Sequence, residues 1–213
     1  MRVANLRRRV WLLLLLDGVE RVGLVPLSKL RLHRLAYLAN ALSPVYDLPV
    51  PDGQLVKYKR GPYYPDLQWD VDRIAVQGLI RIYSIRHKRD EFGWWLDADY
   101  GLTKMGLAVV SQAVSLEDVS RVHSYLCEAA SAFARFSDDH ARDDAPLEDA
   151  TFDNPNQGYD TLIDLSEIRR NLSVQTAASM SELSLGDNPI LPRDQLHLYF
   201  RYMERVLRKA SGQ

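Results

Sequence analysis

The sequence has a single cysteine, no long apolar run and none of the short motifs that mark common enzyme sites. Cys127, being alone, excludes an internal disulfide and a cysteine-based zinc site. No glycine loop leads into a Lys-Ser/Thr pair, no serine lies in a G-x-S-x-G elbow, and the five histidines show no pair at metal-ligand spacing. We therefore expect no catalytic residue, no cofactor and no metal, and a protein that is not an enzyme.

The longest apolar run, Leu12–Leu16, follows three arginines and imitates the start of a signal peptide. Asp17 and Glu20 follow directly, however, and no small-residue cleavage site appears. The run is also too short to cross a bilayer. We read residues 6–22 as a helix that is apolar on most sides, which is typical of a helix covered by several neighbours. The C-terminal half of the chain or a partner protein would supply that cover. We expect a cytoplasmic protein without membrane contact.

Charge is unevenly distributed along the 213 residues, although the net charge is only −1. Residues 1–112 carry 17 Lys+Arg against 11 Asp+Glu, whereas residues 113–213 carry 10 against 17. A basic front half and an acidic back half indicate a charged partner or mutual docking, but a solvated surface explains most such splits.

The stretch from Gly61 to Gly106 predicts a helix, a two-stranded hairpin and the start of another helix. Apolar residues at helical spacing begin at Leu67, and Gly78 provides the left-handed end of that helix. Residues 79–85 and 94–100 read as paired strands that are separated by a charged tip over residues 86–93. Thr103 then caps the next helix. This order is that of a winged-helix domain; an unrelated α+β hairpin is the alternative.

Outside that stretch the patterns predict mainly helices. Ser28 begins a helix that Pro44 ends, and residues 43–65 read as an irregular insertion. Residues 137–160 read as an acidic loop or a partly disordered linker, and a modest helix is expected over 162–172. A turn at Gly186–Pro189 precedes a last amphipathic helix, whereas the tract SVQTAASMSELS fits no pattern.

Winged helices are best known as DNA readers, so the charge around the expected wing matters. The helix before the wing carries Asp66, Asp70 and Asp72 against Arg73 alone, and phosphate would repel such a surface. Basic residues at the tip and ahead of the helix remain candidates for weak contact with a DNA backbone. They are Arg86, Lys88, Arg89, Lys57, Lys59 and Arg60.

Two segments carry a family resemblance: SKLRLHRLAYLAN (28–40) and KYKRGPYYPDLQWDVDRIAVQGLIRI (57–82). They resemble the bacterial Panacea and SocA-like antitoxin group, which shares a K-L-x-K-L-x-Y helix, a Y-G-P-x-x-P turn and G-x-I. The chain is also similar to the middle components of bacterial ABC three-component systems, including Lamassu-type anti-phage defence. The matching residues are Leu30, Leu35, Tyr37, Gly61, Pro62, Pro65, Gly78 and Ile80.

The resemblance covers about residues 28–106, and it implies a non-catalytic subunit placed between an SMC-like ATPase and an effector, often a nuclease. The pattern departs at Arg34, where lysine is usual. The leucine-rich first helix and the acidic back half have no counterpart in it.

We therefore expect an α+β, mostly helical protein with a winged-helix domain over 1–112 and a helical region over 113–213. The expected function is that of a non-catalytic accessory (middle) subunit of a bacterial anti-phage defence complex, a scaffold that bridges an SMC-like ATPase and an effector nuclease. The alternatives are a winged-helix DNA-binding transcriptional regulator, and an antitoxin or proteolytic adaptor.

The first and last helices are expected to form the partner interface, because exposed apolar stripes of that size are rare on stable monomers and aromatic and Met residues are typical of interface cores. Within the wing, Trp94 and Trp95 alternate along the return strand, so one of them should face the core. The interface residues are Leu12, Leu16, Leu196, Tyr199, Phe200, Met203 and Leu207.

Overall fold

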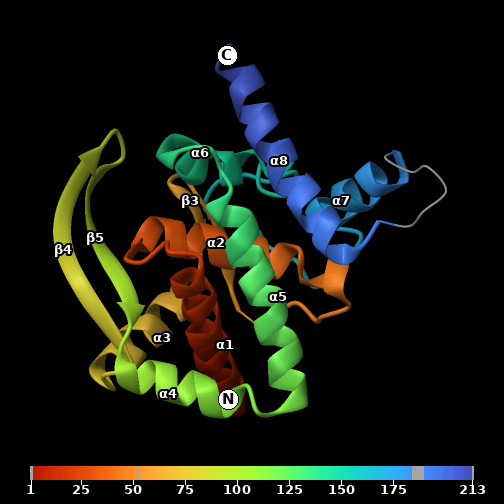
Figure 1. Ribbon diagram of the computed structural model, residues 1–213. Helices are drawn as coiled ribbons and strands as arrows, with labels where there is room; N and C mark the ends of the chain where they lie inside the picture. Colours follow the sequence, from red (N-terminus) through yellow and green to blue (C-terminus); the bar gives the residue numbers. More distant parts are fainter. Residues whose placement is uncertain (1, 52, 184–189, 213) are drawn as a thin grey trace.

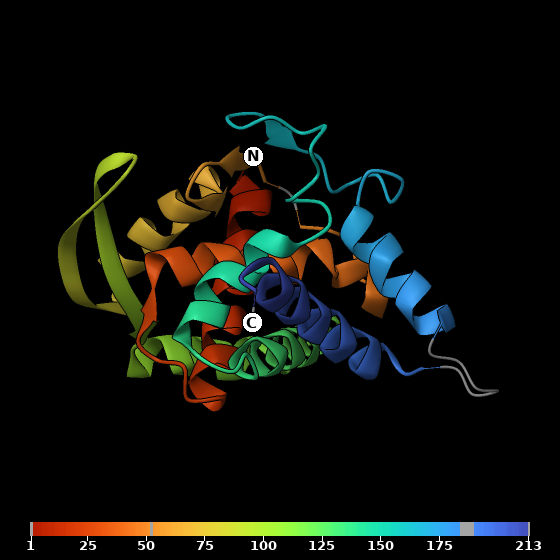
Figure 2. The same cartoon turned by 90° about the horizontal axis from the view of Figure 1, so that it is seen from above.

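The computed structural model describes residues 2–51, 53–183 and 190–212, which form helices and two small antiparallel sheets, one of them with a hairpin at the edge of the molecule (Figure 1 and Figure 2). This combination confirms the α+β class. The turn expected at Gly186–Pro189 lies outside the described residues. The elements are α1 (Arg2–Arg21), β1 (Leu27–Ser28), α2 (Lys29–Ala41), the 3-10 helix η1 (Ser43–Tyr46), β2 (Leu55–Tyr58), β3 (Gly61–Tyr63), α3 (Pro65–Val76), β4 (Ile80–Asp90), β5 (Gly93–Leu102), α4 (Lys104–Ala113), α5 (Glu117–Ala134), α6 (Asp139–Asp144), the 3-10 helix η2 (Ala145–Glu148), β6 (Leu162–Ile163), α7 (Leu172–Leu183) and α8 (Pro192–Ala210).

Across the described part of the chain, no helix combines the length and the apolar character that crossing a membrane requires.

Short-range signals set the helix boundaries in the first half of the chain. The Ser28 hydroxyl accepts a hydrogen bond from the N–H of Arg31 at 3.3 Å, which caps α2. Gly78, with a φ of +73°, follows α3, where residues with side chains would be strained. Thr103 caps α4 by accepting from the N–H of Gly106 at 3.1 Å. These three predictions are confirmed.

The β4–β5 hairpin stands at one side of the molecule, far from α7 in both views (Figure 1 and Figure 2). Its strands are longer than the sequence predicts, and only Glu91 and Phe92 connect them. Residues 86–89, which were expected at a loose tip, are therefore paired within β4. At the base of the hairpin, β1 pairs with β5 through Leu27 and Tyr100.

The second sheet has the order β3-β2-β6 and lies in two regions that were expected to be irregular or helical. Residues 43–65 contain β2 and β3, and β6 replaces the start of the helix expected over 162–172. Residues 173–183 of the tract that fits no pattern lie in α7, and its last residue lies outside the described residues. The side chain of Asn171 donates to the carbonyl of Ala41 at 2.7 Å, and this long-range bond holds the start of α7 against α2.

The acidic segment 137–160 is a folded part of the structure rather than a plain loop, because it contains α6 and η2. Arg31 of α2 binds this segment through Asp143, with an Nε–Oδ1 distance of 2.6 Å, and through Asp139 at 3.1 Å. A basic helix therefore meets an acidic one inside the same chain, which accounts for part of the charge split between the two halves.

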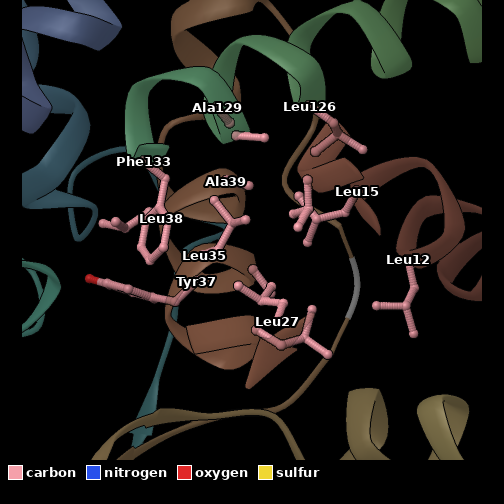
Figure 3. Packing of buried hydrophobic residues seen from close by; sticks show 14 of the residues in the cluster. Leu12, Leu15, Leu27, Leu35, Tyr37, Leu38, Ala39, Leu126, Ala129 and Phe133 are labelled. Atoms are coloured by element: carbon pink, nitrogen blue, oxygen red, sulfur yellow. The ribbon is translucent and has the colours of Figure 1, made fainter. Parts of the chain in front are cut away.

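The leucine-rich helix α1 lies at the centre of the core. It packs against α3, α4, α5 and β5, and each side chain of Leu12–Leu16 is at most 3% exposed. Figure 3 shows Leu12 and Leu15 directed into the same apolar interior as Leu35 and Leu126. The expectation that Leu12 and Leu16 dock a partner is therefore wrong, because other parts of the chain cover the Leu12–Leu16 stretch of this helix.

The expectation that the last helix, α8, docks a partner is wrong for the same reason. Leu196, Tyr199 and Met203 are 0% exposed and Phe200 is 2% exposed, while Leu207 is partly buried at the edge of the core. These residues face α5, α7 and η2 instead of solvent. Both apolar stripes belong to one hydrophobic cluster, which extends from the first helix to the last.

Candidate functional site

The tip of the β4–β5 hairpin is fixed to the turn between β2 and β3 by Arg60. The guanidinium donates to both oxygens of Asp90, at 2.7 and 2.9 Å, and to the carbonyl of Gly93 at 3.2 Å. It also lies 5.8 Å from the centre of the Trp95 ring. The hydrogen bonds from Arg60 lower the pKa of the Asp90 carboxyl. The hairpin is thus held at its tip as well as at its base, and it presents two defined faces.

One face of the β4–β5 hairpin is polar, and its basic side chains neutralise its own carboxylates. Asp97 is fully buried there, and Lys88 binds it with an Nζ–Oδ2 distance of 2.7 Å. Arg86 binds Asp97 at 3.3 Å and Asp99 at 2.6 Å. Bonding to Arg86 lowers the pKa of the Asp99 carboxyl. Arg86 and Lys88 therefore compensate carboxylates of the hairpin itself.

Most of the cationic side chains proposed for DNA contact bind acceptor groups of the protein itself. Lys57 is 6% exposed, and its ammonium donates to the carbonyl of Asn154 at 3.0 Å. Arg60, Arg86 and Lys88 are engaged as described above. Lys59 and Arg89 have no carboxylate partner among the described residues, and each lies over an aromatic ring instead. The six residues therefore do not form a free basic patch, and Lys57 is a buried structural contact.

This pairing yields a first prediction. Lys88→Glu is expected to lower the free energy of unfolding by about 1–3 kcal/mol, because buried Asp97 would lose a partner and gain a repulsive neighbour. Arg89→Glu, on the other face, should change it by no more than about 0.5 kcal/mol. Urea denaturation of the two variants measures the difference. Equal, small losses would show that Asp97 does not need the Lys88 charge.

The other face of the hairpin exposes large apolar side chains. Ile85, Trp94 and Leu96 are 66%, 70% and 53% exposed. The strand register places Ile85 opposite Ala98 and Trp94 opposite Arg89. Side chains alternate between the two faces of a strand, so these residues lie opposite the Lys88–Asp97 face.

A bulge extends this exposed surface toward the base. The register shifts between Ile82 and Ser84, and Tyr83 is the extra residue. Ile82 and Ile85 thereby come to the same face although they are three positions apart, and Ile82 is 43% exposed. We call Ile82, Ile85, Trp94 and Leu96 the hairpin strip.

Trp94 and Trp95 do differ in exposure, but neither lies in the core. Trp94 belongs to the hairpin strip, and Trp95 is half-buried between Arg60 and Lys88. The prediction that one of the two faces the core is wrong, because the hairpin extends beyond the helices that would cover it.

Helix α3, which precedes the hairpin, has a less acidic surface than its sequence indicates. Asp70 is fully buried and accepts from Arg8 at 2.6 Å and from Arg9 at 2.8 Å. Asp72 and Arg73 remain exposed on α3, together with Trp69 and Val76. Asp70 therefore anchors α1 to α3 and would not meet a ligand.

A groove of about 300 Å³ lies between the start of α2, the β2–β3 turn and the hairpin, and its walls include Lys29, His33, Tyr63 and Trp95. Burial lowers the pKa of His33 to about 4, so its ring is neutral. Its Nδ1 accepts from the N–H of Tyr64 at 3.2 Å, which leaves Nε2–H to donate to Gln68. Both nitrogens are thus occupied, and the residues lining this groove provide no free base next to a nucleophile.

Comparison of the sequence with protein-family models and with curated proteins found no match.

Proposed function

We propose that this chain is a non-catalytic docking subunit of a bacterial anti-phage defence complex, which bridges an SMC-like ATPase and an effector nuclease. The hairpin strip carries the proposal and is assigned to the ATPase. Stable monomers rarely expose adjacent large apolar side chains, and patches of this kind mark interfaces between proteins. The other large apolar stripes of the chain, on α1 and α8, are buried in the hydrophobic core.

The order of elements supports the proposal that the hairpin strip lies on the wing of a winged-helix domain. Helix α3, the left-handed Gly78, the β4–β5 hairpin and capped α4 follow one another as in that fold, with the hairpin as the wing. The resemblance of residues 28–106 to middle components of three-component systems indicates the class of partner.

The same residues argue against a DNA-reading regulator. A DNA reader needs free cations around the helix and the wing. Here the exposed residues of α3 are Trp69, Asp72, Arg73 and Val76, which include one cation, and Arg86 and Lys88 neutralise carboxylates of the hairpin. Arg89 pairs with Trp94 on the same face of the hairpin as the strip, and an apolar surface beside such a cation suits a protein partner whose rim is acidic.

Affinity purification from the native host, followed by mass spectrometry, tests this function. The wild-type chain is expected to co-purify with an SMC-like ATPase and an effector nuclease. The double variant Ile85→Glu/Trp94→Glu should reduce recovery of the ATPase more than tenfold, because charges would be buried in an apolar contact. Its thermal midpoint should stay within about 2 °C of wild type, since both side chains are exposed.

Ile168→Glu is the matched control, because Ile168 is 61% exposed but lies outside the hairpin. It should leave recovery of the ATPase unchanged. Co-purification of a small toxin alone would favour the adaptor, and tight binding to one DNA sequence would favour the regulator. Full recovery of the ATPase with the double variant would remove the hairpin strip as its docking site.

A further inference from the structure

Three potential metal ligands meet between α1 and α5, at a distance from the hairpin strip. Asp17 comes from α1, and His123 and Cys127 come from consecutive turns of α5. One donor atom from each residue lies within 4.8 Å of the other two. Asp17 and His123 are buried and Cys127 is half-buried, so the cluster can be reached from the cysteine side.

A close approach of the two helices brings these residues together. A Cβ atom at Gly18 would lie only 3.1 Å from the carbonyl oxygen of Leu126 and 3.2 Å from the Cα of Cys127. Glycine therefore lets the backbone of α1 pass close beside α5. His123 and Cys127, four positions apart, share the side of α5 that faces this crossing.

The arrangement is not that of a cysteine nucleophile with its base. A catalytic histidine uses one ring nitrogen for the nucleophile and the other for the orienting carboxylate. Here both contacts involve Nε2, which lies 2.7 Å from Asp17 Oδ2 and 3.5 Å from Cys127 Sγ.

The same donors suit a metal ion of borderline softness. Thiolate, imidazole and carboxylate are the usual ligands of zinc, which lies about 2.0–2.3 Å from each donor atom, so tetrahedral donors are about 3.2–3.7 Å apart. The Sγ–Nε2 distance of 3.5 Å already fits. The 2.7 Å contact between His123 and Asp17 would have to open by about half an ångström.

Arg21 is the competitor for this position. Its Nε lies 2.6 Å from Asp17 Oδ2, the same oxygen that contacts His123, and its side chain is 60% exposed. A guanidinium with that much exposure can turn into solvent when a divalent cation takes the carboxylate.

We propose that Asp17, His123 and Cys127 form a binding site for zinc, and that Arg21 competes with the ion for Asp17. Three protein ligands leave the fourth tetrahedral position to water or to a partner's side chain. Bound zinc would tie α1, the central helix of the core, to α5. The site is independent of the hairpin strip and of the proposed docking function.

Cobalt(II) titration of the tag-free, full chain tests the site, since Co²⁺ takes the place of zinc and reports its ligands. The expected result is one Co²⁺ per chain, with intense tetrahedral bands in the visible range, a thiolate charge-transfer band in the near ultraviolet, and loss of both on adding Zn²⁺. Cys127→Ser should remove the charge-transfer band and weaken binding at least tenfold. Absence of tetrahedral bands at stoichiometric Co²⁺, or a charge-transfer band that persists in Cys127→Ser, would overturn the proposal.

Arg21→Gln separates a metal site from a purely structural cluster. It should tighten Co²⁺ and Zn²⁺ binding, because the competing cation is gone, whereas a structural ion pair predicts only a loss of stability. His197→Gln is the control, because His197 lies against Glu128 and outside the cluster; it should leave the affinity unchanged. Unchanged or weaker metal binding by Arg21→Gln would contradict the role given to Arg21.

Discussion

Leu16→Asp is expected to unfold the entire chain instead of detaching a partner. Leu16 is fully buried in α1, where four other elements surround the helix. Truncating such a leucine to alanine alone costs about 2–5 kcal/mol, and burying an unpaired carboxylate adds several more. Since small proteins are stable by only about 5–15 kcal/mol, the variant should lose its cooperative thermal transition in circular dichroism.

Leu6→Asp on the same helix provides the control. Leu6 is 60% exposed, so its replacement should change the free energy of unfolding by about 0.5 kcal/mol or less. A folded Leu16→Asp protein with a near-native thermal midpoint would restore the idea that α1 offers a docking face.

The sequence predicts the elements whose boundaries depend on neighbours in the chain. Ser28, Gly78 and Thr103 act through their own backbone surroundings, so α2, α3 and α4 could be placed from local pattern. Helix α7 could not be placed, because its start is held by distant partners such as Ala41. The run Leu12–Leu16, which is apolar on every side of α1, indicates burial, but its sequence does not say what covers it.

The hairpin strip could not be predicted from the sequence for a related reason. In the sequence every Lys and Arg looks equally free, and only the strand register shows that Arg86 and Lys88 face Asp97. The hairpin strip breaks the simple alternation of a strand, because the bulge at Tyr83 brings Ile82 and Ile85 to one face. The proposed zinc site departs from the expectation of no metal, because Asp17 and His123 are 106 positions apart and no spacing rule could pair them with Cys127.

The segment expected to be an acidic loop contains the centre of a buried polar network. Asp149 is 0% exposed. Its carboxylate accepts hydrogen bonds from the hydroxyls of Tyr37, Ser173 and Tyr199, the last two at 2.9 and 2.8 Å. The N–H of Thr151 also donates to it, at 2.9 Å. Burial raises the pKa of Tyr37 and of Tyr199, so both stay protonated and able to donate.

Asp149→Ala is therefore expected to be among the most damaging single changes outside the apolar core. It would leave the three hydroxyls without their acceptor in a space that water cannot fill freely, at a cost of about 3–5 kcal/mol. Because those hydroxyls come from α2, α7 and α8, the loss should appear in urea denaturation together with faster amide hydrogen exchange across α7. Tyr199→Phe removes a single donor and keeps the ring, so it should cost only about 1–2 kcal/mol. If Asp149→Ala cost no more than Tyr199→Phe, the three helices would be held together by apolar packing alone, and the carboxylate would merely be accommodated between them.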